Sequence, residues 1–409
     1  MLKKNPLEIF NMATFLQTQI LMLPVLLLFY QENGLTAGDL FMFQGIFSIT
    51  ALLIEVPAGY IGDIFPRRNV LILSCCFFLC RLILWLFIGC FTDKYWIVLI
   101  GEILYSFSKA FYSGVADGYV YDYLKSQHKT HHMLKGYGKL NFYMSIGTAC
   151  AALIGPKLYK DYGFSVLIII EMILNSTAIG LLFLLPKVPS ARQRVKGLCE
   201  KYKELFSIAK QTFLNSSLFW YIIYSGILAA TTLIFVWSFQ PMMQLMNVPS
   251  EYYGVVYFVN HGVRAVASLL LPITLTIISL RRLAPITYIL FCLAFIAGTI
   301  IVQTANITIG VPLMGFICIV IGFQLTFTLG NVSRLHSLIS SEVRSTTASV
   351  NYLVSRLLAG IMLIVFKFIL DDVRLEKSFL ICLGLFGLSI IPLFLLMRLP
   401  QLKNTLKNN

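Results

Sequence analysis

The sequence has little charge for its length, and acidic residues are especially few. Charged residues make up 12% of the 409 positions, and 18 acidic residues stand against 32 basic ones, a formal net charge of +14. Hydrophobic residues make up 58%. A soluble globular protein does not need so much apolar surface, whereas helices that face lipid do. The basic residues lie between hydrophobic runs, so no nucleic-acid partner is predicted.

Several chemical signatures are missing. The nine cysteines contain no C-x-x-C spacing, which argues against a zinc site or a disulfide framework. No glycine-rich phosphate cradle occurs, which argues against ATP as the energy source. His128, His131 and His132 lie near Asp122, but no spacing fixes a ligand geometry, and a solvated loop is the simpler interpretation. No metal and no cofactor is predicted.

Long apolar runs dominate what is present. A membrane-spanning helix needs about 20 apolar residues, and continuous runs favour helices over barrel strands. No small-residue cleavage site follows the first run, so it is predicted to be retained. The sequence therefore predicts an all-α membrane protein with twelve spans, at roughly 9–30, 39–62, 69–91, 95–123, 136–159, 164–185, 217–245, 252–280, 284–304, 309–335, 346–370 and 378–399.

The loops between these spans differ in charge. Most lysines and arginines fall in alternate loops, and a basic connection over 186–216 divides the first six spans from the last six. Cytoplasmic loops carry the positive excess. The pattern predicts a six-helix half over 1–185, a basic cytoplasmic linker over 186–216 and a second half over 217–409. Both termini are expected in the cytoplasm, in a multi-pass protein of the plasma (inner) membrane.

One charged turn stands between the second and third spans. It runs from Gly59 to Arg68 and contains Gly62, Asp63 and Arg67. Glycines at the end of a helix allow neighbouring backbones to approach closely. The spacing G-x-x-x-D-x-x-P-R-R resembles the loop signature of the major facilitator superfamily, except that a proline replaces the usual glycine.

This resemblance implies a fold and a mechanism. It implies two six-helix halves, each made of inverted three-helix repeats, with substrate bound near the midplane. It also implies a gate in which Asp122 pairs with Arg67 or Arg68, while Asp63 faces the start of the eleventh span near Thr346. In this fold spans 1, 4, 7 and 10 line a central cavity.

Ionisable residues inside the spans are the candidates for coupling. Each costs roughly 2.5–3.5 kcal/mol at the centre of a bilayer, so each needs a partner or a purpose. Glu55, Asp117 and Glu102 are candidate proton carriers, with structural ion pairs as the alternative. Arg81 is expected to pair with Glu102 or Glu171, and a structural role is favoured for Glu171.

Polar residues on the predicted cavity faces are the candidates for binding. Glu102, Tyr105, Lys109 and Tyr112 share one face of the fourth span, which predicts either a cavity lining or interhelical packing. Three interior cations suggest an anionic solute, unless acids of the other half neutralise them. The predicted substrate-binding residues are Gln17, Tyr105, Lys109, Tyr224, Arg264, Gln324, Asn331 and Arg356.

The sequence therefore predicts a proton-coupled secondary transporter of a small organic solute that acts as a monomer. Its partners are the solute, protons and the lipid bilayer. Export of drugs or metabolites by proton antiport and import of an organic acid or siderophore both remain open. An intramembrane enzyme would need a convergent Ser, His and Asp cluster, and a channel would need a ring of like residues. Neither is visible.

Overall fold

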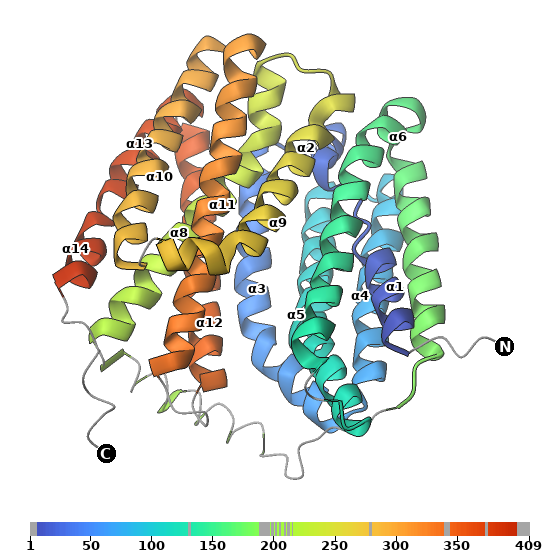
Figure 1. Ribbon diagram of the computed structural model, residues 1–409. Helices are drawn as coiled ribbons and strands as arrows, with labels where there is room; N and C mark the ends of the chain where they lie inside the picture. The colour runs from blue at the N-terminus through green and yellow to red at the C-terminus, as the bar shows by residue number, and fades with distance from the viewer. Residues whose placement is uncertain are drawn as a thin grey trace. The chain divides into compact units, whose positions relative to one another are not determined.

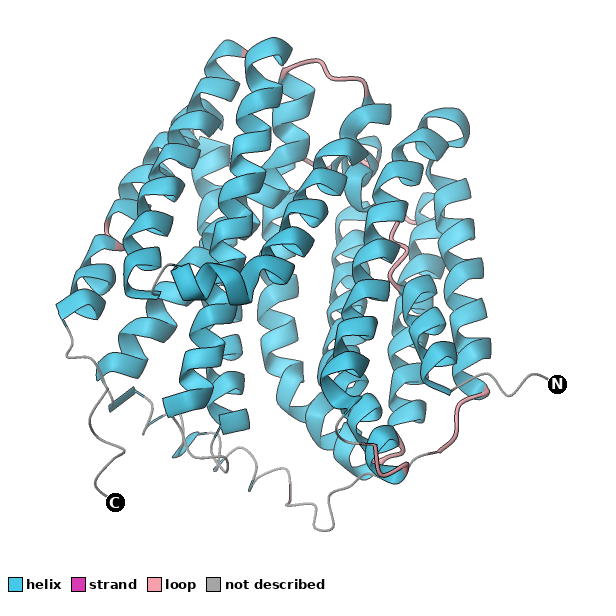
Figure 2. Ribbon diagram, viewed as in Figure 1, coloured by secondary structure: helices cyan, strands magenta, loops and turns pink. Residues whose placement is uncertain are grey.

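The computed structural model describes residues 6–129, 132–187, 216–277, 280–338, 344–372 and 375–398, with eight single positions between 197 and 214. The described residues form helices joined by short connections and contain no strand (Figure 2). Eight helices of the described part of the chain are long and apolar enough to cross a membrane. The predicted all-α membrane fold is confirmed. The chain divides into two compact units, one of Met1–Lys201 with Val248–His261 and one of Tyr202–Asn247 with Gly262–Asn409.

The first unit contains the helices that carry the charged turn (Figure 1). The helix start at Ala37 is fixed by Thr36 and Asp39, whose side chains each bond the other's backbone amide in a capping box. Gly163 has a φ of 74°, a non-helical conformation that divides α6 into two spans. The helices are α1 (Pro6–Gln17), η1 (Leu23–Val25), α2 (Leu26–Glu32), α3 (Ala37–Ile64), α4 (Arg67–Leu86), η2 (Ile88–Cys90), α5 (Lys94–Ser126) and α6 (Met133–Phe183), with η4 (Ser250–Tyr252) and the start of α9 (Tyr253–Ile277) packed beside them.

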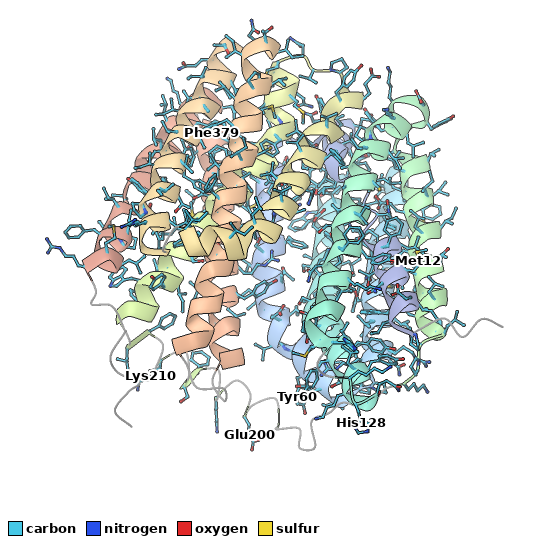
Figure 3. All side chains as sticks on the ribbon, viewed as in Figure 1. Met12, Tyr60, His128, Glu200, Lys210 and Phe379 are labelled. Carbon is cyan, nitrogen blue, oxygen red and sulfur yellow. The ribbon has the colours of Figure 1, made fainter. Side chains whose placement is uncertain are left out.

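The second unit is built around aromatic side chains. The Phe235 ring lies 4.8 Å from that of Phe295 and 6.0 Å from that of Phe379, centroid to centroid. Phe379 is fully buried and marks this core in Figure 3. The helices are α8 (Ser216–Leu245), the rest of α9, α10 (Leu280–Thr304), α11 (Ile307–Leu338), α12 (Arg344–Asp372), α13 (Leu375–Gly387) and α14 (Ile390–Arg398).

Two predicted spans are not continuous helices. The first, expected over 9–30, stops at Gln17 and resumes at Leu23. The last, expected over 378–399, is interrupted at Leu388 and Ser389. Apolar content cannot reveal such breaks, because a buried turn and a buried helix have the same composition. Non-helical backbone at membrane depth is tolerated only where protein or a water-filled cavity surrounds it.

Candidate functional site

The charged turn forms an ion-paired cluster at one end of the first unit. Figure 3 shows Tyr60 and His128 at this end, where α3 and α5 finish. The Arg67 guanidinium, at the start of α4, contacts Asp122 on α5 through its Nε, and its Nη2 lies 3.8 Å from Asp63 Oδ1 on α3. The predicted pairing of Asp122 is therefore made by Arg67.

The neighbouring residues explain why this cluster fits. A Cβ on Gly118 would lie 2.3 Å from Arg67 Nη1, so glycine leaves the guanidinium its space. Arg68 Nη1 instead donates to the carbonyl oxygens of Phe183, at 3.3 Å, and Leu185, at 3.0 Å. This ties α4 to the end of α6.

The two glycines of the turn differ in their surroundings. A Cβ on Gly62 would lie 2.7 Å from a methyl group of Val115, which agrees with the predicted close approach. A Cβ on Gly59 would meet no atom within 4 Å in the described chain, and its close approach to another helix stays a prediction. The expected contact of Asp63 with the start of the eleventh span near Thr346 falls on side chains outside the described residues.

A second ionic cluster lies deep inside the first unit. Arg81 Nη2 is 3.1 Å from Glu102 Oε1, and both side chains are at most 3% exposed. Tyr30 donates its hydroxyl to the same carboxylate at 3.0 Å, and Gln44 donates its amide at 3.3 Å. The predicted partner of Arg81 is therefore Glu102. With three donors around one carboxylate, the packing alternative describes Glu102 better than proton exchange.

Aromatic rings enclose Arg81. Its guanidinium carbon lies 3.9 Å from the ring centroid of Trp85 and 4.5 Å from that of Tyr105. Cation–π contacts strengthen when they are desolvated. Trp85 reaches this position because Gly101 has no side chain: a Cβ there would lie 2.0 Å from the indole nitrogen. Tyr105 therefore packs against the buried ion pair and also belongs to the predicted binding face of its helix.

Next to Tyr105 is a small polar cavity of about 10 Å³, room for about one water molecule. The Lys109 ammonium lies 5.2 Å from the Tyr105 ring centroid. Gln17 donates to Ser74 Oγ at 3.1 Å, and the Tyr112 hydroxyl donates to Thr14 Oγ1 at 3.0 Å. The cavity brings together three predicted binding residues and is lined by Gln17, Thr18, Phe78, Tyr105, Ser108, Lys109 and Tyr112.

The other two candidate proton carriers lie outside both clusters. Ser113 lies 3.3 Å from one carboxylate oxygen of the half-buried Glu55 and 3.5 Å from the other. This links α3 to α5. Asp117 is exposed on α5. Both are therefore more accessible than Glu102.

In the second unit the predicted binding residues are dispersed. Arg264 on α9 makes no hydrogen bond or ion pair with any described residue. Arg356 Nε donates to the Tyr352 hydroxyl at 2.9 Å, one turn earlier on α12. Gln324 donates to Thr328 Oγ1 at 2.9 Å on α11. The side chain of Asn331 lies outside the described residues.

Tyr224 is a packing residue in this structure. It is fully buried, and its hydroxyl donates to the carbonyl oxygen of Ala284 at 2.9 Å, joining α8 to α10. Its helix position was compatible with a cavity lining. In this structure its hydroxyl bonds the neighbouring helix, and its role in binding stays a prediction.

Sequence reasoning missed the buried break between α1 and η1. The Leu21 and Met22 backbone is enclosed, and the Met22 amide donates to Glu171 Oε1 on α6 at 2.9 Å. Glycines on α6 make room for this irregular backbone: a Cβ on Gly155 would lie 2.0 Å from the Leu21 carbonyl oxygen, and one on Gly147 would lie 2.3 Å from Thr18 Oγ1. The only sequence signal of this break was Pro24. It was not decisive, because membrane-spanning helices also tolerate proline without a break.

This fit predicts that Gly155→Ala is destabilising. The added methyl group would push against backbone, so we expect a loss of about 1–3 kcal/mol of unfolding free energy. Gly180→Ala is the matched control, because it lies on the same helix and its Cβ would meet no described atom within 4 Å. Thermal denaturation in detergent measures both. Equal stability of the two variants would contradict the close contact.

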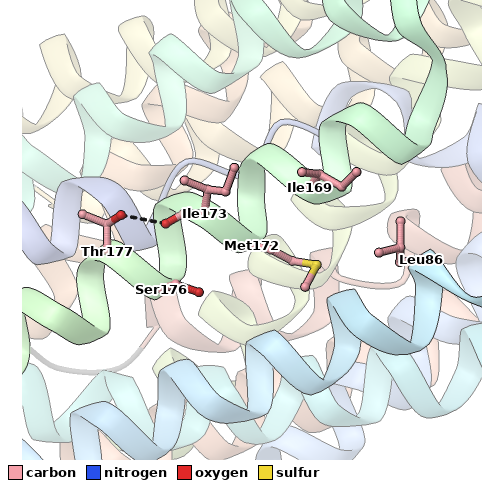
Figure 4. Close-up of a pocket in the computed structure, with 6 residues that line it drawn as sticks. All are labelled: Leu86, Ile169, Met172, Ile173, Ser176 and Thr177. Atoms are coloured by element: carbon pink, nitrogen blue, oxygen red, sulfur yellow. Dashed lines mark hydrogen bonds between the residues drawn. The ribbon is translucent and has the colours of Figure 1, made fainter.

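The outer face of α6 carries a different kind of surface. A pocket of about 540 Å³ there is lined by Leu86, Ile169, Met172, Ile173, Ser176 and Thr177 (Figure 4). The Thr177 hydroxyl already donates to the Ile173 carbonyl oxygen at 2.8 Å. Ile169 and Ile173 are exposed while Glu171, between them, is buried. The pocket therefore lacks charged groups for a polar solute.

The chain resembles known transporters. A sequence model of the Major Facilitator Superfamily matches residues 9–362. No curated protein sequence matches the chain. The structure of the nucleoside transporter NupG is similar with a TM-score of 0.78 at 14% identity, covering 97% of this chain and 100% of that one.

Two other solved structures are similar over comparable lengths. A POT family transporter in complex with 5-aminolevulinic acid has a TM-score of 0.71 at 10% identity, covering 96% of this chain and 95% of that one. A bacterial homologue of the human lysosomal transporter Spinster, inward-facing and occupied, has a TM-score of 0.69 at 13% identity, covering 96% of each chain. At these identities the likeness shows a shared fold.

Proposed function

This chain belongs to the Major Facilitator Superfamily, and from that membership we propose that it moves a small organic, anionic or amphiphilic solute across the membrane by alternating access, driven by protons. Alternating access requires a site that opens to one side at a time. As a transporter of this superfamily the protein takes a small-molecule substrate.

The choice of an anionic solute is supported by one observation. Lys109, Arg264 and Arg356 lie within helices of the membrane fold, and none has a carboxylate within 4.0 Å among the described residues. An uncompensated cation inside a membrane protein is expensive, and a carboxylate or phosphate on the solute would neutralise it. Arginine can grip such a group through two parallel hydrogen bonds.

Gln17, Tyr105 and Gln324 complete the proposed binding set. Gln17 and Tyr105 line the same small cavity as Lys109. Gln324 offers an amide on α11. Asn331 follows on the same helix, and it is proposed as a binding residue from its sequence position alone. These neutral polar groups would orient a solute whose charge the cations hold.

We propose that Asp63, Arg67, Arg68 and Asp122 form the cytoplasmic gate. The contacts of Arg67 with both acids support this, since they join three helix ends through one side chain. The Arg67 and Asp63 side chains keep 12% and 10% of their surface exposed, while Asp122 keeps 2%, so water reaches this cluster only at its edge. Gly59 is included in the proposed gate motif only because of its spacing from Asp63 in the sequence.

We propose Glu55 on α3 and Asp117 on α5 as the proton carriers. Glu102 is not proposed, because Arg81, Tyr30 and Gln44 already hold its carboxylate. Proton antiport would export a solute, and symport would import an organic acid or siderophore. The neighbours named above carry nucleosides and bind 5-aminolevulinic acid, which supports small polar organic solutes as the first compounds to test.

An enzyme is not proposed. Within the described part of the chain, no three His, Cys, Asp or Glu side chains are grouped to hold a metal. The loop charges support both termini in the cytoplasm and the plasma (inner) membrane as location. We also propose that the monomer is the working unit, without a nucleic-acid partner.

Ligand binding tests the anionic solute. Acidic metabolites, including 5-aminolevulinic acid, should raise the melting temperature of the purified protein, because a ligand bound to the folded state stabilises it. Lys109→Gln should weaken that binding by about tenfold, the loss of about 1.4 kcal/mol. Lys125→Gln is the control, since Lys125 is exposed at the end of the same helix. Stabilisation by cationic compounds alone would contradict the proposal.

A further inference from the structure

Glu171 is a buried acid of the first unit that the proposed mechanism leaves unused. It is 1% exposed on α6, and its Oε1 accepts the Met22 amide at 2.9 Å where the first span is broken. Its Oε2 has no hydrogen-bond partner among the described residues. Buried polar atoms are nearly always paired, so this oxygen calls for an explanation.

A second orphan acceptor lies one helical turn away. Asn175 is also 1% exposed, and its amide nitrogen donates to the Cys75 carbonyl oxygen at 2.9 Å. Its Oδ1 has no partner in the described chain. Residues four apart on a helix are neighbours, with Cβ atoms about 5–6 Å apart. A proton on Glu171 Oε2 would turn that oxygen into a donor and let it satisfy Asn175 Oδ1.

The charge balance around Glu171 points the same way. The cation that acts on it is Arg81 of α4, which is already 3.1 Å from Glu102 of α5. No ion pair within 4.0 Å joins Arg81 to Glu171 in the described residues. One guanidinium therefore faces two buried carboxyl groups, and a proton on Glu171 would make the group neutral.

Among the described residues, the other elements packed on α6 supply no second cation to this acid. These elements include α1, α2, α4, α5, η1, η4 and the start of α9. Their charged groups engage elsewhere: Glu8 of α1 with Lys139, Glu251 of η4 with Lys160, and Arg67 of α4 with Asp122 of α5. Lys109 of α5 lies over the Tyr105 ring.

We propose that Glu171 is a proton-binding residue that couples protonation to the conformation of the broken first span. In the neutral form, Oε2–H donates to Asn175. When the proton leaves to water, the carboxylate is held only by the amide groups exposed at the break, and charge-assisted bonds to backbone N–H groups favour the broken backbone. Gln17, the last residue of α1, and Thr18, the first residue of the break, line the polar cavity. Glu171 and the polar cavity thus both contact the five-residue segment between α1 and η1.

This inference rests on the proposed proton-coupled transport but can be tested without it. Infrared difference spectra of the purified protein over a pH titration report protonated carboxyl groups through their carbonyl stretch. Wild-type protein should show a carboxylic acid band that is absent in Glu171→Gln and present in Glu8→Gln, the control at the exposed pair with Lys139. A spectrum unchanged in Glu171→Gln would overturn the proposal.

Transport gives the second test. In proteoliposomes, Glu171→Gln should reduce accumulation driven by a pH gradient by about tenfold, within the usual range of coupling energies, while solute exchange stays near wild type. Glu171→Asp, which keeps a titratable group, should retain part of the coupling. Equal loss of exchange and accumulation in both variants, or unfolding of the neutral Glu171→Gln variant, would overturn the proposal. A wild-type protein that transports nothing but keeps the band would sink only the transport function.

Discussion

Glu102→Ala should lower the unfolding free energy by about 3–5 kcal/mol, the cost of leaving one partner of a buried ion pair alone. The variant strands Arg81, which is 3% exposed, and removes the acceptor of Tyr30 and Gln44. The enclosing rings of Trp85 and Tyr105 hold the guanidinium where water cannot replace the carboxylate. Denaturation in mixed detergent micelles measures the loss.

Two comparisons separate the ion pair from general damage. Glu32→Ala, at an exposed glutamate that accepts a bond from Tyr159, should cost no more than about 1 kcal/mol. The double variant Arg81→Leu and Glu102→Leu should be much less destabilised than Glu102→Ala, because it leaves neither partner of this ion pair alone. A Glu102→Ala variant as stable as Glu32→Ala would show that the pair does not exist.

Arg67→Ala should reduce solute flux below about a tenth of wild type, since a gate works only through contacts that differ between states. Arg67 touches both Asp63 and Asp122, so its loss frees three helix ends at once. The variant should also lose part of its stability, because the Asp122 side chain is 2% exposed and a buried carboxylate left without its partner is costly. Flux in proteoliposomes and the melting temperature measure the two effects.

Lys125→Ala is the matched control for the gate. Lys125 is a basic side chain at the same end of α5 as Asp122, but it is exposed. Its removal changes the local charge by the same amount without touching Asp63 or Asp122. Wild-type flux in Arg67→Ala, or equal losses in both variants, would remove Arg67 from the gate.

Sequence patterns predicted those features that depend on composition and local spacing. Apolar runs about 20 residues long located most spans, and the spacing of Asp63, Arg67 and Arg68 indicated the family. Spacing also limited the partners of Arg81 to two acids of similar depth. It could not choose between Glu102 and Glu171, because that choice depends on how α4, α5 and α6 rotate against one another.

The features that sequence patterns did not predict depend on tertiary contacts between helices. The break after Gln17 forms because Gly147 and Gly155 of α6 leave space for backbone and Glu171 bonds the free amide of Met22. These residues are more than a hundred positions away in sequence. The contact of Tyr224 with Ala284 could not be predicted for the same reason: helical periodicity places a residue on a face, but the neighbouring helix decides what that face meets.

Solute accumulation in proteoliposomes tests coupled transport most directly. Purified protein would be supplied with radiolabelled acidic metabolites, nucleosides, peptides and cationic drugs, each with and without an imposed pH gradient. We expect at least one acidic solute to accumulate above its external concentration when the gradient is present, and to lose that accumulation when a protonophore is added. Solutes that equilibrate at the same rate with or without the gradient would contradict proton-driven alternating access.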